Sequence, residues 1–340
     1  FERISWDEAL DTVAREMQRV KETYGNSALY VPYGTGSFSN INGAPPVRRL
    51  LNLFGGRLAF YGNYSLAATQ AATPTVYGTE KSGNQRLDWL NTRYVLMWGW
   101  NPAEMRDDTN SDYFLRLAHE NGARVVCIDP RLNMSVPGLA DEWVPIRPGT
   151  DTAMMSAMAY VLIREGLYDA EFVRTHCSGF DASQMPAGAE NDESYQDYIL
   201  GTRDGTPKTP RWAEAITGVP AEKIVEIARD YGTIKPAMLY QGYGMQRRAY
   251  GEQVVRAGCV LAAITGNVGI PGGWASGVSF PADEGPVKYI LPEGDNPVKT
   301  KIPVFLWSEA VLRGAELSAR QGVTGADHLD NPIKLIYAVA

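Results

Sequence analysis

The chain has 340 residues, of which 44% are hydrophobic and 21% charged, and its formal net charge is -7 at pH 7. This length suits two domains of about 100 to 200 residues, each with a substantial core. The acidic balance argues against a nucleic-acid surface. No apolar run approaches the roughly 18 residues that a membrane span needs. The composition therefore predicts a globular protein with no nucleic-acid partner and no direct membrane span.

The cysteines and histidines do not form a recognisable metal site. Cys127, Cys177 and Cys259 are far apart, so there is no Cys-x-x-Cys pair to suggest zinc or an iron–sulfur cluster. The three histidines are equally scattered. We expect each cysteine to be a small buried hydrophobe. The chain begins at Phe1 without a signal segment, so we interpret it as a piece of a larger protein.

The first predicted element is an amphipathic helix. Ser5 and Glu8 have capping-box spacing, and apolar residues then recur every three or four positions until Gly25. The positions that this pattern places on the apolar face are Trp6, Leu10, Val13, Met17 and Val20.

A loop and a serine follow this helix. The strand predicted at 28–32 and the helix predicted from Pro45 flank residues 34–43, which are rich in Gly, Ser and Asn. This loop is either a plain connector or a segment that approaches a ligand. Tyr-Gly-Asn-Tyr-Ser at 61–65 precedes an Ala- and Thr-rich helix, so Ser65 lies near a helix N-terminus, where backbone N–H groups favour an anionic group.

From Arg93 onward, strands and helices alternate. Apolar strands are predicted at 94–98 and 124–128, and a third strand is predicted to begin at 141–145. Polar residues with Gly or Pro follow each strand, as Gly99-Trp100-Asn101-Pro102, Asp129-Pro130-Arg131 and Arg147-Pro148-Gly149-Thr150-Asp151. In an open parallel sheet this edge is where ligands bind. No Gly-x-Gly-x-x-Gly follows the first strand, so the common NAD or FAD fingerprint is missing.

The second half repeats this strand, turn and helix order. A strand at 236–241 leads into Gly242-Tyr243-Gly244-Met245-Gln246 and a helix at 251–265. The segment 266–273 contains four glycines, which permit either tight turns or close approach to a ligand. The remaining predictions are helices at 152–167, 220–231 and 308–320, a strand at 333–339, a surface loop at 179–209 and irregular chain at 274–300.

Taken in order and spacing, these motifs resemble the molybdopterin oxidoreductases of the dimethyl sulfoxide reductase family. The motifs that carry the resemblance are Gly99 to Pro102, Ile128 to Arg131, Arg147 to Asp151, Gly242-x-Gly with Gln246, and Thr265 to Gly269. The segment Asp295 to Thr300 is similar to the catalytic subunit of the membrane-associated, three-subunit enzymes of that family. The resemblance covers nearly the whole chain.

The resemblance implies a cofactor and a set of site residues. Family members hold one molybdenum between two molybdopterin guanine dinucleotides. By resemblance, Ser65 is the protein ligand to molybdenum and Arg256 lies near the active site. The residues that the resemblance assigns to the cofactor are Trp100, Asn101, Pro102, Asp129, Pro130, Arg131, Gly149, Asp151, Gly242, Gly244, Gln246, Gly266 and Asn267.

Some of these assignments have structural alternatives. Asp129 and Asp151 either serve the nucleotide or cap the helices that follow them. Arg256 either faces the site or is a helix arginine whose charged head lies in solvent. A serine alkoxide is a hard oxygen donor suited to an oxophilic metal. In the family, serine at position 65 indicates S-oxide or N-oxide reduction, whereas cysteine or selenocysteine marks the nitrate and formate enzymes.

The resemblance also implies a fold. We expect two three-layer α/β domains with mostly parallel sheets and a Rossmann-like nucleotide-binding topology, one domain being inserted in the other. The predicted bounds are 1–91 for the first part of the domain that carries Ser65, 92–233 for the dinucleotide-binding domain, and 234–340 for the return to the first domain.

The function that the resemblance implies is anaerobic respiration by oxygen-atom transfer from an S-oxide such as dimethyl sulfoxide to molybdenum. The alternatives are an N-oxide or oxyanion (selenate-type) reductase, or a non-catalytic nucleotide-binding or docking module. The implied partners of the full-length protein are an iron–sulfur electron-transfer subunit and a membrane anchor subunit, at the periplasmic face of the cytoplasmic membrane.

Two parts of the family pattern are absent from this chain. Family members carry a Cys-rich iron–sulfur segment before the matched region and a β-rich domain after it. We therefore expect this chain alone to retain neither molybdenum nor an iron–sulfur cluster and to show no reductase activity.

Overall fold

The computed structural model describes residues 2–34, 43–105, 110–190, 192–278 and 291–339. The chain forms two compact units, unit 1 from residues 1–64 and 285–340 and unit 2 from residues 65–284. Of the predicted loop at 34–43, residues 35–42 lie outside the described residues. No helix among the described residues is long and apolar enough to cross a membrane.

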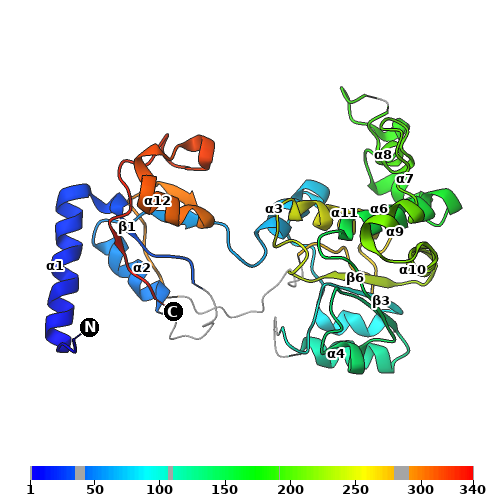
Figure 1. Cartoon of the computed structure of the whole chain (residues 1–340), viewed down its shortest axis with the longest axis horizontal. Helices are drawn as coiled ribbons and strands as arrows, with labels where there is room; N and C mark the ends of the chain where they lie inside the picture. The colour runs from blue at the N-terminus through cyan, green and yellow to red at the C-terminus, as the bar shows by residue number, and fades with distance from the viewer. Residues whose placement is uncertain (1, 35–42, 106–109, 191, 279–290, 340) are drawn as a thin grey trace. The chain divides into compact units, whose positions relative to one another are not determined.

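Unit 1 is built from two parallel strand pairs with helices around them (Figure 1). Strand β1 pairs with β8, and β2 pairs with β7. A single parallel bridge from Tyr30 to Leu58 links the two pairs. The elements of unit 1 are α1 (Trp6–Tyr24), β1 (Leu29–Tyr30), α2 (Ala44–Leu53), β2 (Ala59–Tyr61), β7 (Lys301–Pro303), α12 (Trp307–Arg313) and β8 (Leu335–Ile336).

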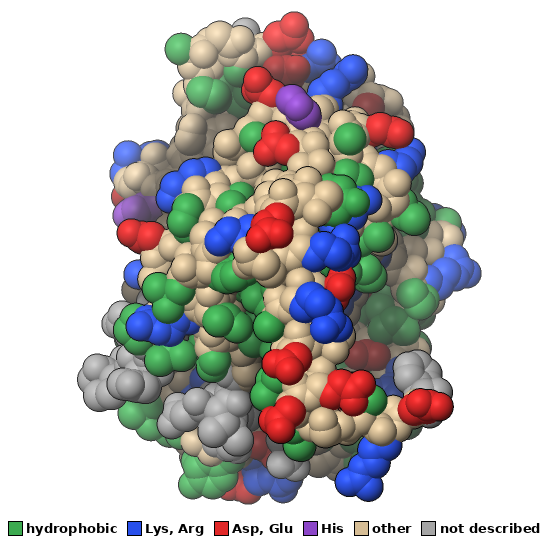
Figure 2. Space-filling view, turned by 90° about the vertical axis from the view of Figure 1, so that its left-hand side faces the viewer, with side chains coloured by type: hydrophobic (Ala, Val, Ile, Leu, Met, Phe, Trp, Pro, Cys, Tyr) green, Lys and Arg blue, Asp and Glu red, His purple; other side chains and the backbone are tan. Residues whose placement is uncertain are grey.

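Helix α1 begins as the sequence predicts but buries only its second half. The Ser5 Oγ accepts a hydrogen bond from the Glu8 N–H (3.1 Å), which caps the helix. Met17 and Val20 pack into the core of unit 1, whereas the predicted inward-facing Trp6 is 82% exposed. Leu10 and Val13 are exposed too, and hydrophobic side chains lie among charged ones on the face of the molecule in Figure 2.

Unit 2 contains a parallel sheet whose strands lie in the order β5-β4-β3-β6 among the described residues. The chain adds β4 and β5 on one side of β3 and then returns to place β6 on the other side. The strands of this sheet are β3 (Tyr94–Trp98), β4 (Arg124–Ile128), β5 (Glu142–Val144) and β6 (Ala237–Gln241). The helices of unit 2 are α3 (Ala67–Tyr77), α4 (Ser111–Glu120), α5 (Val136–Leu139), α6 (Asp151–Glu165), α7 (Ala170–His176), α8 (Tyr195–Leu200), α9 (Pro210–Thr217), α10 (Ala221–Thr233) and α11 (Gly251–Ile264).

Helices cover both faces of this sheet, and every residue of β3 and β6 is therefore buried. Leu96 and Trp98 point into a core formed with α6, α10 and α11, whereas Val95 and Met97 point into a second core with Leu115 of α4. Figure 1 shows α4 on one side of β3 and β6, with α6, α10 and α11 on the other. The near-continuous apolar strands of the sequence therefore belong to a sheet buried on both faces.

The two compact units differ from the predicted domain bounds. Unit 1 ends at Tyr64 and not at residue 91, and the chain from 234 onward does not return to it directly. The reason is strand pairing, because β6 forms hydrogen bonds along β3 from Tyr94 to Trp98. Helix α11 follows β6 and packs against α3 and α6, so it belongs to the same unit.

Three local predictions were wrong in extent. The predicted loop at 179–209 contains helix α8, which begins where Ser194 caps it and ends at Gly201. The predicted helix at 308–320 ends as an α-helix at Arg313 and continues only as short 3-10 turns. The predicted strand at 333–339 pairs with β1 over Leu335–Ile336 alone.

The amino-terminal edge of the sheet in unit 2 is held by Asn267. This side chain is fully buried, and its Oδ1 accepts a hydrogen bond from the Ala237 N–H (3.0 Å) where β6 begins. Its Nδ2 donates to the Thr265 Oγ1 (2.9 Å) at the end of α11. One side chain thus fixes the end of the helix to the start of the strand.

We predict that Asn267→Ala lowers the free energy of unfolding by about 1–3 kcal/mol, because the Ala237 N–H is left buried without an acceptor. Urea denaturation of the purified chain measures the effect. Asn121→Ala at the exposed end of α4 is the matched control and should change stability by less than about 0.5 kcal/mol. Equal effects of the two substitutions would contradict this role of Asn267.

Candidate functional site

The carboxyl ends of β3 and β6 meet at a pair of glycines. A Cβ atom on Gly242 would lie 1.9 Å from the Gly99 carbonyl oxygen, so no other residue fits at position 242 without moving the backbone. Gly99 has a φ of +56°, which also favours glycine. The strand order reverses between β3 and β6, and ligands of open α/β sheets bind outside such a reversal. Gly244, by contrast, is exposed, with its nearest neighbouring atom 3.9 Å from a built Cβ.

The turn after β6 holds Ser65 through its backbone. The Gln246 Nε2 donates to the Ser65 carbonyl oxygen (2.6 Å) and to the Tyr243 carbonyl oxygen (3.0 Å). The Arg247 Nε donates to the same Ser65 oxygen (2.9 Å), and its guanidinium lies over the Tyr243 ring. Gln246 is buried and the Arg247 side chain is exposed, so the turn places one neutral and one cationic donor on the backbone of Ser65.

The Ser65 hydroxyl remains available. Ser65 is half-buried and lies two residues before the first residue of α3, and among the described residues its Oγ has no hydrogen-bond partner. Leu66 occupies the N-cap position and has no side chain that could cap the helix. The structure therefore fixes the serine through its carbonyl and leaves its hydroxyl without a partner in the described part of the chain.

At the end of β4 the polar side chains bond to one another. Asp129 Oδ1 accepts from the Arg131 N–H (2.8 Å), and its Oδ2 accepts from the Asn133 Nδ2 (3.2 Å). Asn101 Oδ1 accepts from the Ser135 hydroxyl (2.7 Å), while the Arg131 side chain pairs with a neighbouring glutamate. Asp129 thus organises the turn that follows β4. A carboxylate has about four acceptor positions, so each oxygen can still accept from a ligand.

At the start of α6, a buried carboxylate lies close to a cation. Asp151 is only 5% exposed, and its Oδ1 accepts from the Trp98 Nε1 (3.0 Å). The Arg248 Nη2 lies 3.8 Å from its Oδ2, and the Arg248 Nη1 donates to the Gly149 carbonyl. Burial raises the pKa of the Asp151 carboxyl, while the bond from Trp98 and the charge of Arg248 act in the opposite direction. Gly149 (φ +85°) leaves room for the guanidinium.

Three residues that were predicted to bind the cofactor either lie away from the carboxyl edge of the sheet or pack in the core. Trp100 is fully buried and stacks on Tyr240 (ring centroids 3.7 Å apart), so its side chain belongs to the core. Gly266 and Asn267 lie beyond the end of α11, and Asn267 bonds to the first residue of β6. They are therefore at the opposite edge of the sheet from Gly242, because parallel strands begin together at one edge and end at the other.

Arg256, Pro102 and Pro130, which were also predicted as site residues, differ in their positions and contacts. Arg256 donates from its Nε to the Thr75 Oγ1 (3.0 Å), which lies near the end of α3. At 1.5 Å per residue, this point is about 12 Å along the helix from Ala67. Pro102 is buried behind the β3 turn and Pro130 is exposed after β4. The turn after β6, the turn after β4 and the start of α6 therefore carry most of the predicted set, without Arg256.

Sequence reasoning did not include Arg247 and Arg248 among the site residues. The structure places Arg247 on Ser65 and Arg248 on Gly149 and Asp151. The signal was present in the sequence, because two consecutive arginines stand directly between a glycine-rich turn and a helix.

Burial disfavours the ionised form of all three cysteines. Burial raises the pKa of Cys127 and of Cys259 to about 12. Burial also raises the pKa of the half-buried Cys177. The prediction of a small buried hydrophobe is confirmed for Cys127 and Cys259, and it is wrong for Cys177, which is half-buried.

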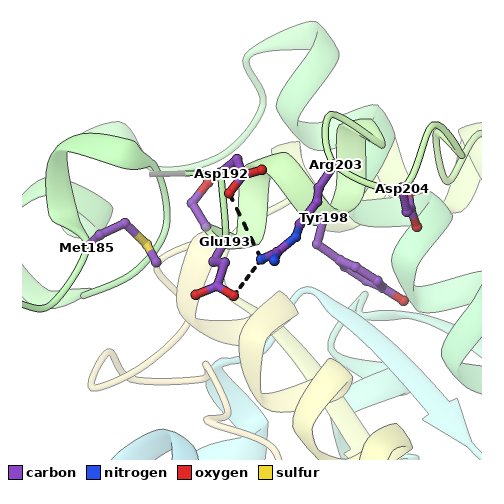
Figure 3. A pocket seen from close by; sticks show the side chains of 7 residues that line it. Met185, Asp192, Glu193, Tyr198, Arg203 and Asp204 are labelled. Atoms are coloured by element: carbon purple, nitrogen blue, oxygen red, sulfur yellow. Dashed lines mark hydrogen bonds and ion pairs between the residues drawn. The ribbon is translucent and has the colours of Figure 1, made fainter. Parts of the chain in front are cut away.

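A cavity of about 430 Å³ near α8 contains acidic residues but none of the predicted site residues (Figure 3). Its carboxylates already have cationic partners, because the Arg203 guanidinium lies 2.5 Å from Glu193 and 4.0 Å from Asp192, and Asp204 pairs with Lys208. Among the described residues, no group of three or more His, Cys, Asp or Glu side chains could hold a metal ion.

Comparison with known proteins supports the same reading. The family model described as molybdopterin oxidoreductase matches residues 1–338. The chain is 46% identical to the probable dimethyl sulfoxide reductase chain YnfF of Escherichia coli over all of its length and 42% of that protein. It is 44% identical to the dimethyl sulfoxide reductase DmsA of the same organism, again over all of this chain and 43% of that protein. The chain thus spans less than half the length of these relatives.

A solved structure is similar as well. The acetylene hydratase of Pelobacter acetylenicus superimposes with a TM-score of 0.56 at 27% identity, over 78% of this chain and 33% of that one. The match of the family model to almost every residue, together with relatives near 45% identity, shows that the chain belongs to the molybdopterin oxidoreductases of the dimethyl sulfoxide reductase family.

Proposed function

We propose that this chain contributes the metal-ligating serine and part of a dinucleotide site to a molybdenum-dependent S-oxide reductase. The observation that carries the proposal is the arrangement at Ser65, whose carbonyl accepts hydrogen bonds from Gln246 and Arg247 while its Oγ has no partner among the residues that the structure describes. A serine ligand that must bind a metal in one orientation needs a fixed backbone and an unpaired hydroxyl. Both are present.

The residues at the carboxyl edge fit the chemistry of a molybdopterin guanine dinucleotide. Arg247 and Arg248 provide cationic donors for a pyrophosphate, and the 14-residue helix α11 begins three residues after Arg248. Asp129 provides acceptors for guanine N–H groups or ribose hydroxyls. Gly244 is exposed and without a side chain, which allows a ligand to approach the backbone.

The cofactor supplies the redox chemistry when it is bound, and this chain's residues position it and exclude competing interactions. The Ser65 oxygen would be the protein donor to molybdenum, and metal coordination would remove its proton. Gln246 would fix the serine from the buried side, and Arg247 from the exposed side. Asp151 would set the place of Arg248, because the carboxylate and the Gly149 carbonyl both face the guanidinium.

For the full-length protein we propose an S-oxide such as dimethyl sulfoxide as substrate, electrons from an iron–sulfur subunit, and attachment to the periplasmic face of the membrane through an anchor subunit. The dimethyl sulfoxide reductases among the similar proteins support the substrate class. Trimethylamine-N-oxide reductases are 31–33% identical to this chain, so an N-oxide is the second candidate substrate.

We expect Ser65→Ala in the full-length, cofactor-loaded protein to abolish sulfoxide reduction, because the metal loses its only proposed ligand from this chain. Reduced-viologen oxidation measures activity, and metal analysis shows whether molybdenum is retained. Ser183→Ala, at an exposed turn away from the predicted site residues, is the control and should leave activity unchanged. Undiminished turnover by Ser65→Ala would instead favour a nucleotide-binding module.

Gln246→Leu should lower the molybdenum content and the activity of the full-length protein together, since the serine carbonyl loses its buried donor and the helix start is free to move. Each of the two hydrogen bonds that are lost corresponds to roughly 0.5–1.5 kcal/mol. Gln253→Leu, at an exposed position of α11, is the matched control. A normal molybdenum content with lost activity would mean that Gln246 contacts the substrate and does not support Ser65.

A substrate panel tests the proposed reaction class. We expect kcat/KM for S-oxides to exceed that for N-oxides and for selenate when reduced viologen is the donor to the full-length enzyme. Dimethyl sulfoxide reductases are 44–46% identical to this chain and trimethylamine-N-oxide reductases 31–33% identical, which favours S-oxides as the substrate class. Preference for selenate over every S-oxide would replace the proposed substrate class with an oxyanion.

A further inference from the structure

Unit 2 has a second cavity at the other end of the α3 and α11 helix pair. The two helices run parallel, because Ser65 lies beside Gln246 near their beginnings and the Tyr77 hydroxyl bonds to the Cys259 carbonyl (2.8 Å) near their ends. The cavity has a volume of about 570 Å³ and is enclosed by the end of α3, by α7 and by α11. It is separated from Ser65 by most of the length of α3, about 15 Å.

The walls of this cavity are apolar and aromatic. Side chains of Tyr77, Phe172, Phe180 and Tyr195 line it together with aliphatic residues of α11 such as Ile264. As far as the structure describes the lining, it contains no Lys, Arg, Asp or Glu. A volume of this size, with apolar walls and few polar groups, is typical of small-molecule sites. A charged ligand would have no oppositely charged side chain to pair with there, whereas a neutral aromatic ligand would pack against the aromatic side chains.

One side chain on the lining has a defined polarity. His176 lies flat on Phe172, with ring centroids 4.7 Å apart and planes 14° apart. Its Nδ1 is 2.7 Å from the Thr175 Oγ1, and that hydroxyl is also 2.6 Å from the Glu171 carbonyl oxygen. A carbonyl can only accept, so the single hydroxyl proton of Thr175 points to Glu171.

It follows that Nδ1 of neutral His176 carries the proton and donates it to Thr175. The Nε2 is then an unprotonated acceptor, and no described residue occupies it. His176 is itself exposed, so the cavity combines aromatic walls with one hydrogen-bond acceptor at its solvent-facing rim.

We propose that this cavity binds a small neutral aromatic alcohol, whose ring packs between the aromatic walls and whose hydroxyl donates to the Nε2 of His176. The site is separate from the proposed cofactor site, and it does not depend on the proposed reductase activity. Cys177 also lines the cavity, but its thiol is not needed for recognition.

Isothermal titration calorimetry of the 340-residue chain with 2-naphthol and with 2-methoxynaphthalene tests the proposal. The two probes share an aromatic body, and only the first can donate a hydrogen bond. We expect 2-naphthol to bind more tightly to the wild type, and we expect this preference to fall about 5-fold in His176→Phe, the value of one neutral hydrogen bond. The phenyl ring retains the stacking on Phe172.

His119→Phe is the matched control, because His119 lies on α4 and bonds to Asp141 outside this cavity. Its preference for 2-naphthol should equal that of the wild type. Ser178→Trp, at an exposed position on the rim, should abolish binding of both probes by filling the entrance.

Three results would overturn the proposal. They are no saturable binding of either probe to the wild type at millimolar concentration, an unchanged preference in His176→Phe, and retained binding in Ser178→Trp. If a variant fails to fold, amide shifts of the wild-type chain decide, because binding at this site must move the signals of Val76, Phe180 and Val268.

Discussion

The close approach of Gly99 and Gly242 is the constraint on which the rest of unit 2 depends. Two neighbouring parallel strands end here, and the absence of a side chain at Gly242 lets the chain pass within contact of the Gly99 carbonyl. The turn that follows is therefore tight. It brings Gln246 and Arg247 onto the backbone just before α3, although more than 180 residues separate them in sequence from Ser65.

The two edges of this sheet have different tasks. At the amino-terminal edge, polar groups satisfy one another, as when Arg124 pairs with Glu142, Glu226 and Asp230 or when Asn267 bonds to β6. At the carboxyl edge, the Ser65 hydroxyl has no partner among the described residues, and the Arg247 side chain is exposed. The turn after β4 is also bonded internally at this edge, so the groups left available there belong to Ser65 and to the turn after β6.

The local pattern predicted most of unit 2 correctly because its elements are long, periodic and buried. Strands β3, β4 and β6 and helices α6, α10 and α11 were each predicted to within about two residues. Predictions failed where the partner of an element lies far away in sequence. The apolar face of α1 is an example. Trp6 and Met17 were both predicted to lie on it, but only Met17 is buried in the core.

The candidate site divides in the same way. The polar residues after each strand could be predicted, because a strand end with Gly, Asp or Arg is a local signal. The sequence does not distinguish Trp100 from these polar residues as a binding residue. Only the packing of Tyr240, which comes from another strand, shows that the Trp100 ring belongs to the core. Arg256 and Asn267 likewise belong to matching motifs, but α11 carries them away from the carboxyl edge.

The sequence by itself determined the α/β class, the parallel strands, the serine near a helix start and the family, because each depends on residues close together or on motifs in a fixed order. Only the tertiary structure decided that β6 joins β3, that Ser65 is held through its carbonyl, and that Arg247 contacts Ser65 while Arg248 contacts Gly149 and Asp151. These depend on contacts between segments that no local pattern encodes. The physical reason is that the burial and the hydrogen bonds of a residue depend on which distant segment packs against it, and the residue's own local sequence does not specify that segment.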